Sequence, residues 1–341
     1  MNYHKEFPII DISKFETDFE HLSEAIYHAS KEWGFFILSG HDIKTVDEIF
    51  DLSKKFFDLP LEVKAEKTVN DKAVGYDGKA KTTFAASEGM TFGCTPGAIL
   101  ETDHLPIWWD LPKRTAIEAF KADCYKLSID IMSCFAIQLG LPRDYFQKSH
   151  DHKDPGNNLK LIKYPKMKMS EGQTVPRLSE HTDWGSITFV FTNQGGLEIR
   201  DPNNEWCEVP IVPGGIVVNI GDALSLWTDQ ALKSTMHRIT WQNLPVDKDR
   251  YSIAYFTNPN FDATLSTPGC TVSDSASDII TYREYYKVRQ WLTYGGLEDK
   301  LGQRALADID PKAIEAVRSL NVANSGLLQS HIRPTDTPIT I

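Results

Sequence analysis

Apolar residues recur every three or four positions in several stretches of the chain, a spacing that places them on one face of a helix. The longest stretch runs from Pro112 to Gly140, and Gly140 with Pro142 supplies a stop signal at its end. Thr45 is a residue type that favours the N-cap of another helix. We therefore predict helices over residues 18–33, 45–57, 112–140, 280–293 and 302–320.

Short apolar runs bounded by turn residues predict β-strands in two parts of the chain. Residues 7–12 and 34–39 form two such runs near the N-terminus. Between Leu159 and Phe256, turns such as Asp201-Pro-Asn-Asn204 separate eight more runs. These runs are 159–164, 185–191, 196–200, 206–209, 215–220, 224–228, 235–241 and 251–256. This pattern predicts two packed antiparallel sheets, and with the helices it makes an α+β protein.

Composition and charge narrow the class of protein. The 341 residues, 41% hydrophobic and 24% charged, suffice for a sizeable core in one large domain or two ordinary ones. A net charge of −11 disfavours nucleic acid and anionic membranes as partners, because both require a basic surface. We find neither a secretory signal nor an apolar run near the roughly 18 residues of a membrane span. Five cysteines without a Cys-x-x-Cys pattern indicate reduced thiols in the cytoplasm, so we expect a cytoplasmic monomer or homodimer with a small-molecule partner.

The segment Glu180-His181-Thr182-Asp183-Trp184-Gly185 carries the clearest chemistry. In a strand, His181 and Asp183 point to the same side, and His237 can reach them from another strand. Two histidines and one carboxylate that leave open positions favour non-haem Fe(II) and oxygen chemistry. Zinc accepts the same ligand types, and each residue alone has an ordinary structural explanation, so these three residues leave the metal open.

A second pair, Arg250-x-Ser252, lies in the strand-like run that ends at Phe256. A guanidinium and a hydroxyl on one face can clamp a carboxylate through paired hydrogen bonds. A hydrolytic zinc site has no need of such a clamp, which favours iron. The alternative is a surface ion pair, because Arg250 follows the charged loop 246–249.

Together, His181-x-Asp183, His237 and Arg250-x-Ser252 resemble the signature of the 2-oxoglutarate/Fe(II)-dependent dioxygenases related to isopenicillin N synthase. The resemblance covers about residues 7–260 and implies a double-stranded β-helix, or jelly-roll, core flanked by helices. It also implies an N-terminal region, residues 1–110, packed on a catalytic core, residues 111–341, in one compact unit. The matching N-terminal pieces are Pro8-Ile-Ile-Asp11, Trp33-Gly-Phe-Phe36, Gly40-His-Asp-Ile43 and Phe56-Phe-Asp-Leu-Pro60-Leu-Glu-Val-Lys64.

The same resemblance implies the cofactor and co-substrates: Fe(II), with 2-oxoglutarate and O2. His181, Asp183 and His237 would be the iron ligands, and no catalytic residue is expected beyond them. Arg250 and Ser252 would bind the distal carboxylate of 2-oxoglutarate.

Residues 159–165 resemble the family strand whose tyrosine touches the co-substrate, which here is Tyr164. Plant members typically have asparagine where this chain has Ile162, so a co-substrate contact at that position is in doubt. Lys160 shares a face with Tyr164 by alternation and is either a pocket residue that meets an acidic group or a solvated lysine. The aromatic residues that we expect in the pocket wall are Phe84, Phe92, Trp108, Phe191 and Phe256.

The activity implied is oxidation of a C–H bond in a small-molecule metabolite, by hydroxylation, desaturation or oxidative ring rearrangement, in a biosynthetic pathway. One alternative is an Fe(II) oxidase like isopenicillin N synthase or 1-aminocyclopropane-1-carboxylate oxidase, which does not use 2-oxoglutarate. A second is a non-catalytic binding protein that keeps the jelly-roll shape, although such a protein has no use for three metal ligands.

Overall fold

A computed structural model describes residues 6–70, 72–78, 87–93, 98–151, 154–166, 177–240, 244, 247–266, 280–294 and 311–324. Its helices are α1 (Phe19–Glu32), α2 (Val46–Phe57), α3 (Leu61–Lys64), α4 (Ala98–Glu101), α5 (Leu111–Gln138), the 3-10 helix η1 (Gln147–Ser149), α6 (Asp222–Trp227), α7 (Tyr282–Tyr294) and α9 (Pro311–Asn324). Its strands are β1 (Ile9–Asp11), β2 (Phe35–Ser39), β3 (Val74–Asp77), β4 (Glu88–Phe92), β5 (Asn158–Tyr164), β6 (Leu178–His181), β7 (Ile187–Phe191), β8 (Leu197–Arg200), β9 (Trp206–Glu208), β10 (Ile216–Ile220), β11 (His237–Ile239) and β12 (Arg250–Thr257).

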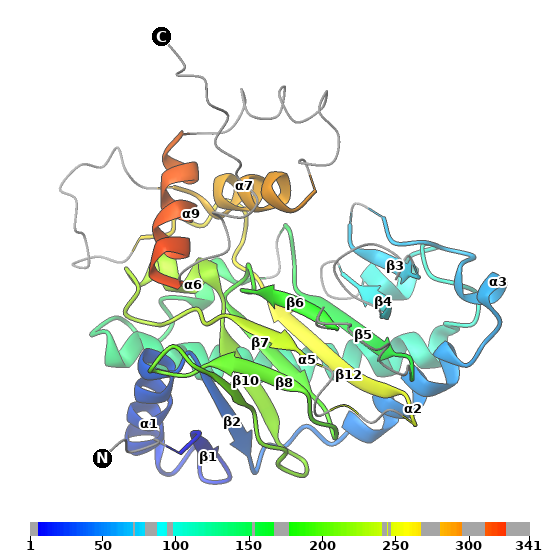
Figure 1. The fold of residues 1–341 in the computed structure, drawn as a ribbon, viewed down its shortest axis with the longest axis horizontal. Coiled ribbons are helices and arrows are strands. Elements are labelled where there is room, and N and C mark those ends of the chain that lie inside the picture. Colours follow the sequence, from blue (N-terminus) through cyan, green and yellow to red (C-terminus); the bar gives the residue numbers. More distant parts are fainter. Residues whose placement is uncertain are drawn as a thin grey trace.

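The strands form two sheets (Figure 1). The larger has the order β1-β2-β10-β7-β12-β5-β4-β3, and the smaller has the order β6-β11-β8-β9. This confirms the predicted α+β class with a jelly-roll core. The larger sheet is mixed and not purely antiparallel, since β1 pairs with β2 in parallel. Because β2 also pairs with β10, strands from the N-terminal region and from the later part of the chain share one sheet.

Helices cover one face of the larger sheet. Helix α5 contacts α1, α2 and β12, and it lies behind the sheet in Figure 1. Its start is fixed by Asp110, whose side chain accepts a hydrogen bond from the backbone N–H of Lys113, and by proline in the first turn. Buried residues such as Phe120, Ile131 and Phe135 fill the space between this helix and the sheet.

The opposite face of the larger sheet meets the smaller sheet. A second apolar cluster lies there, built from alternate residues of both sheets, including Phe35, Ile37, Val217, Ile199 and Ile239. Alternation along each strand therefore divides the side chains into a helix-facing set and an inter-sheet set. The inter-sheet set carries the chemistry described below.

The helices predicted at 18–33, 45–57 and 112–140 are confirmed as α1, α2 and α5, with ends shifted by one or two residues. The predicted helix 280–293 is confirmed as α7. The last predicted helix is observed over Pro311–Asn324, and most of its expected first half lies outside the described residues. Thr45 is the N-cap of α2, but its side chain makes no capping hydrogen bond.

One strand prediction is wrong, and three observed strands have no counterpart among the predicted runs. Residues 224–228 were expected as a strand, yet they belong largely to helix α6. This segment is buried on almost every side, so its hydrophobic pattern has neither a two-residue nor a helical period to distinguish the two. These strands are β3 and β4, which lie in a glycine-rich stretch, and β6, whose residues are all partly exposed and include no extended apolar run.

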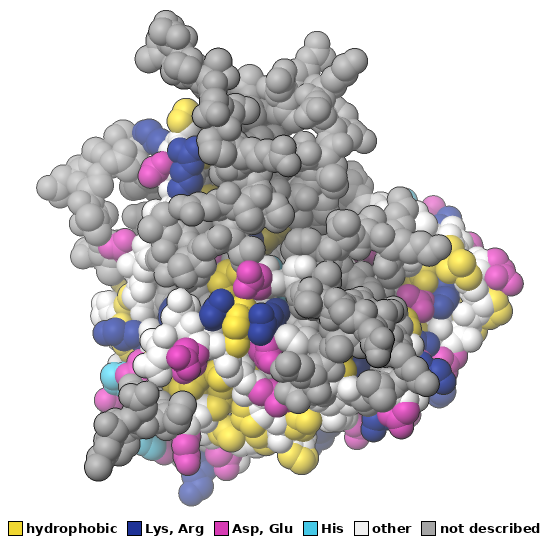
Figure 2. Space-filling view, in the orientation of Figure 1, with side chains coloured by type: hydrophobic (Ala, Val, Ile, Leu, Met, Phe, Trp, Pro, Cys, Tyr) yellow, Lys and Arg dark blue, Asp and Glu magenta, His cyan; other side chains and the backbone are white. Residues whose placement is uncertain are grey.

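Acidic and basic side chains are interspersed among the described residues on the face drawn in Figure 2. Cys124, Cys134 and Cys207 are free thiols, and the other two cysteines lie outside the described residues. None of the helices in the described ranges has the length and apolarity needed to cross a bilayer.

Candidate metal centre

Three side chains converge between the two sheets. His181 ends β6, His237 begins β11, and the two residues are directly paired across these strands. Asp183 lies two residues past the end of β6, in the turn before β7, and not within a strand as expected. Its Oδ1 atom is 3.8 Å from Nε2 of His181 and 3.7 Å from Nε2 of His237. One donor atom from each residue lies within 4.8 Å of the others, so the predicted set is brought together.

Both imidazole rings are oriented by the backbone. Nδ1 of His181 lies 2.8 Å from the carbonyl oxygen of Ser179, and Nδ1 of His237 lies 3.2 Å from that of Thr235. A carbonyl can only accept, so each Nδ1 carries the proton and each Nε2 keeps its lone pair. A backbone contact of this kind is how metal-binding histidines are commonly fixed.

The carboxylate of Asp183 is oriented in a similar way. Its Oδ2 atom accepts hydrogen bonds from the Thr188 hydroxyl at 2.6 Å and from the Asn219 amide at 2.8 Å. Burial would raise the pKa of Asp183, but the adjacent His237 and His181 and these two hydrogen bonds lower it below its usual value. The carboxylate is therefore charged at neutral pH, with Oδ1 directed at the two imidazoles.

The electrostatics of the site suit a divalent metal ion. Burial, together with the neighbouring His237, lowers the pKa of His181 to about 4, so this imidazole is neutral and able to ligate at pH 7. Two ligand atoms that each lie about 2.0–2.2 Å from a metal, at right angles to one another, are about 3 Å apart. The observed separations of 3.8 and 3.7 Å would therefore have to shorten by less than about 1 Å when a metal binds. The two nitrogen donors and one oxygen donor fit Fe(II).

Arg250 and Ser252 lie on the inter-sheet face of β12, opposite β5. Arg250 is 2% exposed and pairs with Tyr164 across the two strands. Its guanidinium donates from Nε to the carbonyl oxygen of Gly195 at 3.0 Å and lies 3.4 Å from the Ser252 hydroxyl. The carbon of the guanidinium is 5.2 Å from the centre of the Tyr164 ring. The guanidinium is therefore buried and oriented, and the alternative of a surface ion pair does not fit its burial.

Burial lowers the pKa of Arg250, and nearby Arg177 lowers it further. The carbon of the Arg177 guanidinium also lies 5.6 Å from the Tyr164 ring, so two cations flank this tyrosine. This positive potential between the sheets suits a carboxylate.

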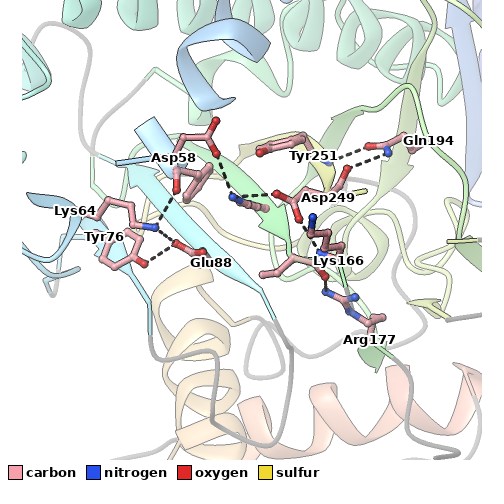
Figure 3. A network of polar contacts seen from close by, with 12 residues as sticks. Asp58, Lys64, Tyr76, Glu88, Lys166, Arg177, Gln194, Asp249 and Tyr251 are labelled. Carbon is pink, nitrogen blue, oxygen red and sulfur yellow. Dashed lines mark hydrogen bonds and ion pairs between the residues drawn. The ribbon is translucent and has the colours of Figure 1, made fainter. Parts of the chain in front are cut away.

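The residues on either side of Arg250 belong to a network of polar contacts (Figure 3). The Gln194 amide donates to the backbone carbonyl of Asp249 at 3.2 Å and accepts from the backbone N–H of Tyr251 at 3.0 Å. The Asp249 carboxylate is 3.0 Å from Nζ of Lys163 and accepts from the backbone N–H of Lys166 at 2.7 Å. These contacts fix the start of β12.

An apolar wall connects the metal ligands to the arginine. Phe35 packs edge-on against His237, with ring centres 5.4 Å apart, and belongs to the same buried cluster as Tyr164. Arg250 in turn packs on Tyr164. The three metal-ligand candidates and the Arg250–Ser252 pair thus lie on the same, inter-sheet side of the larger sheet.

Of the expected pocket residues, Lys160 and Phe256 face the same side of the sheet. Phe256 pairs with Thr188, which contacts Asp183, and Lys160 pairs with Ala254 one strand further along. Burial lowers the pKa of Lys160, whose Nζ lies 3.9 Å from Asp77, and its side chain remains about one-third exposed.

The structure does not bring three of the other aromatic residues to this space. Phe92 packs on Trp109, with ring centres 4.8 Å apart, and Phe191 packs on Phe120 of α5 at 5.2 Å. Trp108 contacts Phe56 of α2. All three belong to the helix-facing core, because the two-residue period of β4 and β7 directs Phe92 and Phe191 away from the inter-sheet face. Phe84 lies outside the described residues.

Two residues that hold Asp183 were not predicted from the sequence. Asn219 is the one polar residue of the strand β10, and Thr188 lies in the apolar strand β7. A buried polar residue in an otherwise apolar strand needs a hydrogen-bond partner, and this was the available signal.

Two family models match this chain. Residues 7–109 match the N-terminal domain of the non-haem dioxygenases of morphine synthesis, and residues 146–259 match the 2OG-Fe(II) oxygenase superfamily. The second match spans the three metal-ligand candidates, Arg250 and Ser252.

This chain is also similar to curated proteins and to solved structures. UPF0676 protein C1494.01 of Schizosaccharomyces pombe is 33% identical over 314 residues, which cover 85% of this chain and 93% of the relative. The 1-aminocyclopropane-1-carboxylate oxidase of Dictyostelium mucoroides is 27% identical, with 76% and 83% coverage. The crystal structure of a full-length Neurospora crassa protein in complex with α-ketoglutarate (2-oxoglutarate) and thymine is similar with a TM-score of 0.73 and 29% identity, covering 86% of this chain and 99% of that protein.

Proposed function

Because this chain belongs to the 2OG-Fe(II) oxygenase superfamily, we propose that it oxidises a C–H bond of a small-molecule metabolite in a biosynthetic reaction. As a 2-oxoglutarate-dependent dioxygenase it uses Fe(II), with 2-oxoglutarate and O2 as co-substrates. The observation that carries the proposal is that His181, Asp183 and His237 come together on the side of the larger sheet where Arg250 is buried. A metal site and a cationic anchor on one side of the sheet are what this co-substrate requires.

In this proposal, His181, Asp183 and His237 hold the iron through Nε2, Oδ1 and Nε2. When bound, the iron supplies the chemistry of oxygen activation, coupled to the decarboxylation of 2-oxoglutarate. The chain itself orients the ligands: Ser179 and Thr235 fix the imidazole tautomers through their carbonyl groups. The apolar residues between the sheets exclude water from this space.

Arg250 and Ser252 bind the distal carboxylate of 2-oxoglutarate. The guanidinium keeps Nη donors available, because its Nε is already bonded to Gly195. Tyr164 supports the guanidinium with its ring face and limits how the co-substrate can lie. A buried cation that lacks an acidic side chain as its direct partner among the described residues is stabilised when a carboxylate binds.

Lys160 and Phe256 contribute to the substrate pocket. Phe256 supplies an apolar surface beside Thr188, and Lys160 offers a cation for an acidic or strongly polar group of the substrate. Its 3.9 Å distance from Asp77 is too long for a hydrogen bond, so a substrate can compete for the ammonium group.

The alternative candidate function is that of an Fe(II) oxidase, in which Arg250 and Ser252 would hold the carboxylate of the enzyme's own substrate. The similarity to a 1-aminocyclopropane-1-carboxylate oxidase favours keeping this alternative. Succinate released per substrate consumed separates the two: one-to-one stoichiometry supports 2-oxoglutarate dependence, and turnover without succinate supports the oxidase.

The central experiment is an anaerobic titration of Fe(II) with 2-oxoglutarate. The chelate should give a weak visible charge-transfer band, and His181→Ala should abolish it. A matched control is His28→Asn, at an exposed position of α1, which should keep the band. A wild-type protein that gives no band and binds no Fe(II) would contradict the proposal. A screen of metabolites scored by 2-oxoglutarate turnover would then identify the substrate.

A further inference from the structure

A buried carboxylate, Asp222, lies behind the metal-ligand candidates. It is 1% exposed and starts helix α6. Its Oδ2 accepts a hydrogen bond from the Thr182 hydroxyl at 2.9 Å, and its Oδ1 accepts one from the Ser234 hydroxyl at 2.6 Å. Thr182 lies between His181 and Asp183, and Ser234 lies three residues before His237. One carboxylate therefore joins the two segments that carry the three ligands.

Helix α7 supplies two further partners of this carboxylate. The Tyr285 hydroxyl donates to Oδ2 of Asp222 at 2.9 Å, and Nη1 of Arg289 lies 3.1 Å from the same oxygen. Nη2 of Arg289 is 3.3 Å from the carbonyl oxygen of Thr182, and the guanidinium lies 5.4 Å from the Trp184 ring. Figure 1 shows α7 beyond the end of β6, on the side of the sheets away from α1. Arg289 thus contacts both Asp222 and the segment between the first two ligands.

We propose that Arg289 is a positioning residue for the metal centre, acting through Asp222 and Thr182. This inference rests on the proposed function, since it requires that the centre binds Fe(II). Helix α7 lies outside the two matched regions, residues 7–109 and 146–259, so the family motifs do not contain this support.

The physical reason is the charge balance of a buried cluster. A buried carboxylate that loses its cationic partner is strongly destabilised unless it moves. Such a movement would weaken the bonds from Thr182 and Ser234, and the two ligand-bearing segments would no longer be held at one separation. Contacts of this indirect kind commonly change metal affinity by about 10- to 100-fold when they are removed.

The test is the affinity for Fe(II) alone, measured anaerobically by competition with a chromophoric chelator. Arg289→Gln removes the charge, Arg289→Lys keeps it, and Arg283→Gln is the matched control on an exposed position of the same helix. We expect R289Q to raise the Kd for Fe(II) at least tenfold, R289K to recover most of the affinity, and R283Q to match the wild type. At saturating iron, the KM for 2-oxoglutarate should change less than twofold in R289Q, because Arg250 lies elsewhere.

A double-mutant cycle tests the route. Thr182→Val removes the hydroxyl that Asp222 binds. The Kd for Fe(II) of the T182V/R289Q double mutant should therefore rise clearly less than the product of the two separate fold-changes. Should R289Q fail to fold, judged by the melting curve of the metal-free protein, Tyr285→Phe removes a single hydroxyl and should raise the Kd about threefold.

The outcomes separate cleanly. Unchanged Fe(II) affinity in folded R289Q, or in Y285F where R289Q does not fold, would overturn the inference and leave the proposed function intact. Fully multiplicative effects in the double mutant would overturn the route through Asp222. A wild type that does not bind Fe(II) would overturn both.

Discussion

The side-chain amide of Gln194 hydrogen-bonds the backbone on both sides of Arg250. Its amino group donates to the carbonyl of the preceding residue at 3.2 Å, and its oxygen accepts from the N–H of the following residue at 3.0 Å. The next residue in the loop, Gly195, accepts from Nε of Arg250 itself. A single short loop thus fixes both the backbone and the guanidinium of the co-substrate anchor, which is the support that a binding site requires.

Replacing Gln194 with methionine should weaken 2-oxoglutarate binding without affecting the metal ligands. Gln194→Met keeps the length of the side chain but removes both hydrogen bonds, each worth about 1 kcal/mol. We expect the KM for 2-oxoglutarate to rise about tenfold while kcat changes by less than twofold, measured by succinate release. Gln138→Met, at the end of α5, is the matched control. A fall in kcat that exceeds the rise in the KM for 2-oxoglutarate would contradict the assignment of Gln194 to the anchor.

Arg250→Lys should have a larger effect on the same constant. Lysine keeps the charge but cannot supply two parallel donors, and it cannot bond Gly195 and a carboxylate in the same geometry. We expect the KM for 2-oxoglutarate to rise by about 10²- to 10³-fold, in keeping with the loss of a buried charged hydrogen bond. The affinity for Fe(II) alone should stay at the wild-type value. Arg238→Lys, which pairs with Glu198 on the outer face of β11, is the control.

The candidate metal ligands could be identified from the sequence because few residue types perform this chemistry. His181, Asp183 and His237 form an unusual combination, and the later Arg250 and Ser252 gave it a second, independent constraint. The local structure was less accurately predicted, since Asp183 follows the strand β6 and is placed by its bonds to Thr188 and Asn219. Those partners come from other strands, which sequence spacing alone does not locate.

For the core aromatic residues, the hydrophobic pattern predicts the strand but not the side of the sheet on which each ring lies. An aromatic residue in a strand has two possible sides, and the register of the sheet decides between them. Phe256 lies on the inter-sheet side, whereas Phe191, on the neighbouring strand, packs on Phe120 of α5. The contact of Arg289 with Asp222 was equally hidden, because 67 positions separate them and only the folded chain brings α7 to the site.

The stability of the metal-free protein should depend on pH through His181. An unfolded imidazole has a pKa near 6.5, whereas burial and His237 lower the pKa of folded His181 to about 4. Below pH 6.5 the unfolded chain takes up a proton that the folded chain does not, so this contribution is complete above pH 6.5 and is lost as the pH falls towards 4. When the pH falls from 7.5 to 5.0, we expect the free energy of unfolding to decrease by about 1–2 kcal/mol more in the wild type than in His181→Asn.

Urea unfolding of the metal-free proteins at these two pH values provides the measurement. His28→Asn, at an exposed position on α1, should retain the full pH dependence of the wild type. Parallel pH curves for the wild type and His181→Asn would show that this imidazole is not held neutral by its surroundings.

Gly185 should be irreplaceable, because the turn after Asp183 leaves no room for a side chain. A Cβ at this position would clash with Oδ1 of Asn258 and would lie 2.7 Å from the carbonyl oxygen of Thr257. Thr257 is the last residue of β12 and Asn258 follows it directly. The backbone N–H of Asn258 is itself bonded to Asn157, so neither neighbour can yield without disturbing the sheet. Gly185→Ala should therefore displace the turn and with it the carboxylate of Asp183. We expect a loss of about 2–3 kcal/mol in the free energy of unfolding, in the range of overpacked cores, and a Kd for Fe(II) at least tenfold higher.

Gly214→Ala is the control, because its Cβ would meet nothing within 4 Å, although its φ of +69° gives it a backbone cost of its own. It should lose about 1 kcal/mol of stability and bind Fe(II) as the wild type does. A G185A protein with wild-type Fe(II) affinity would show that the position of Asp183 does not depend on the close packing of this turn.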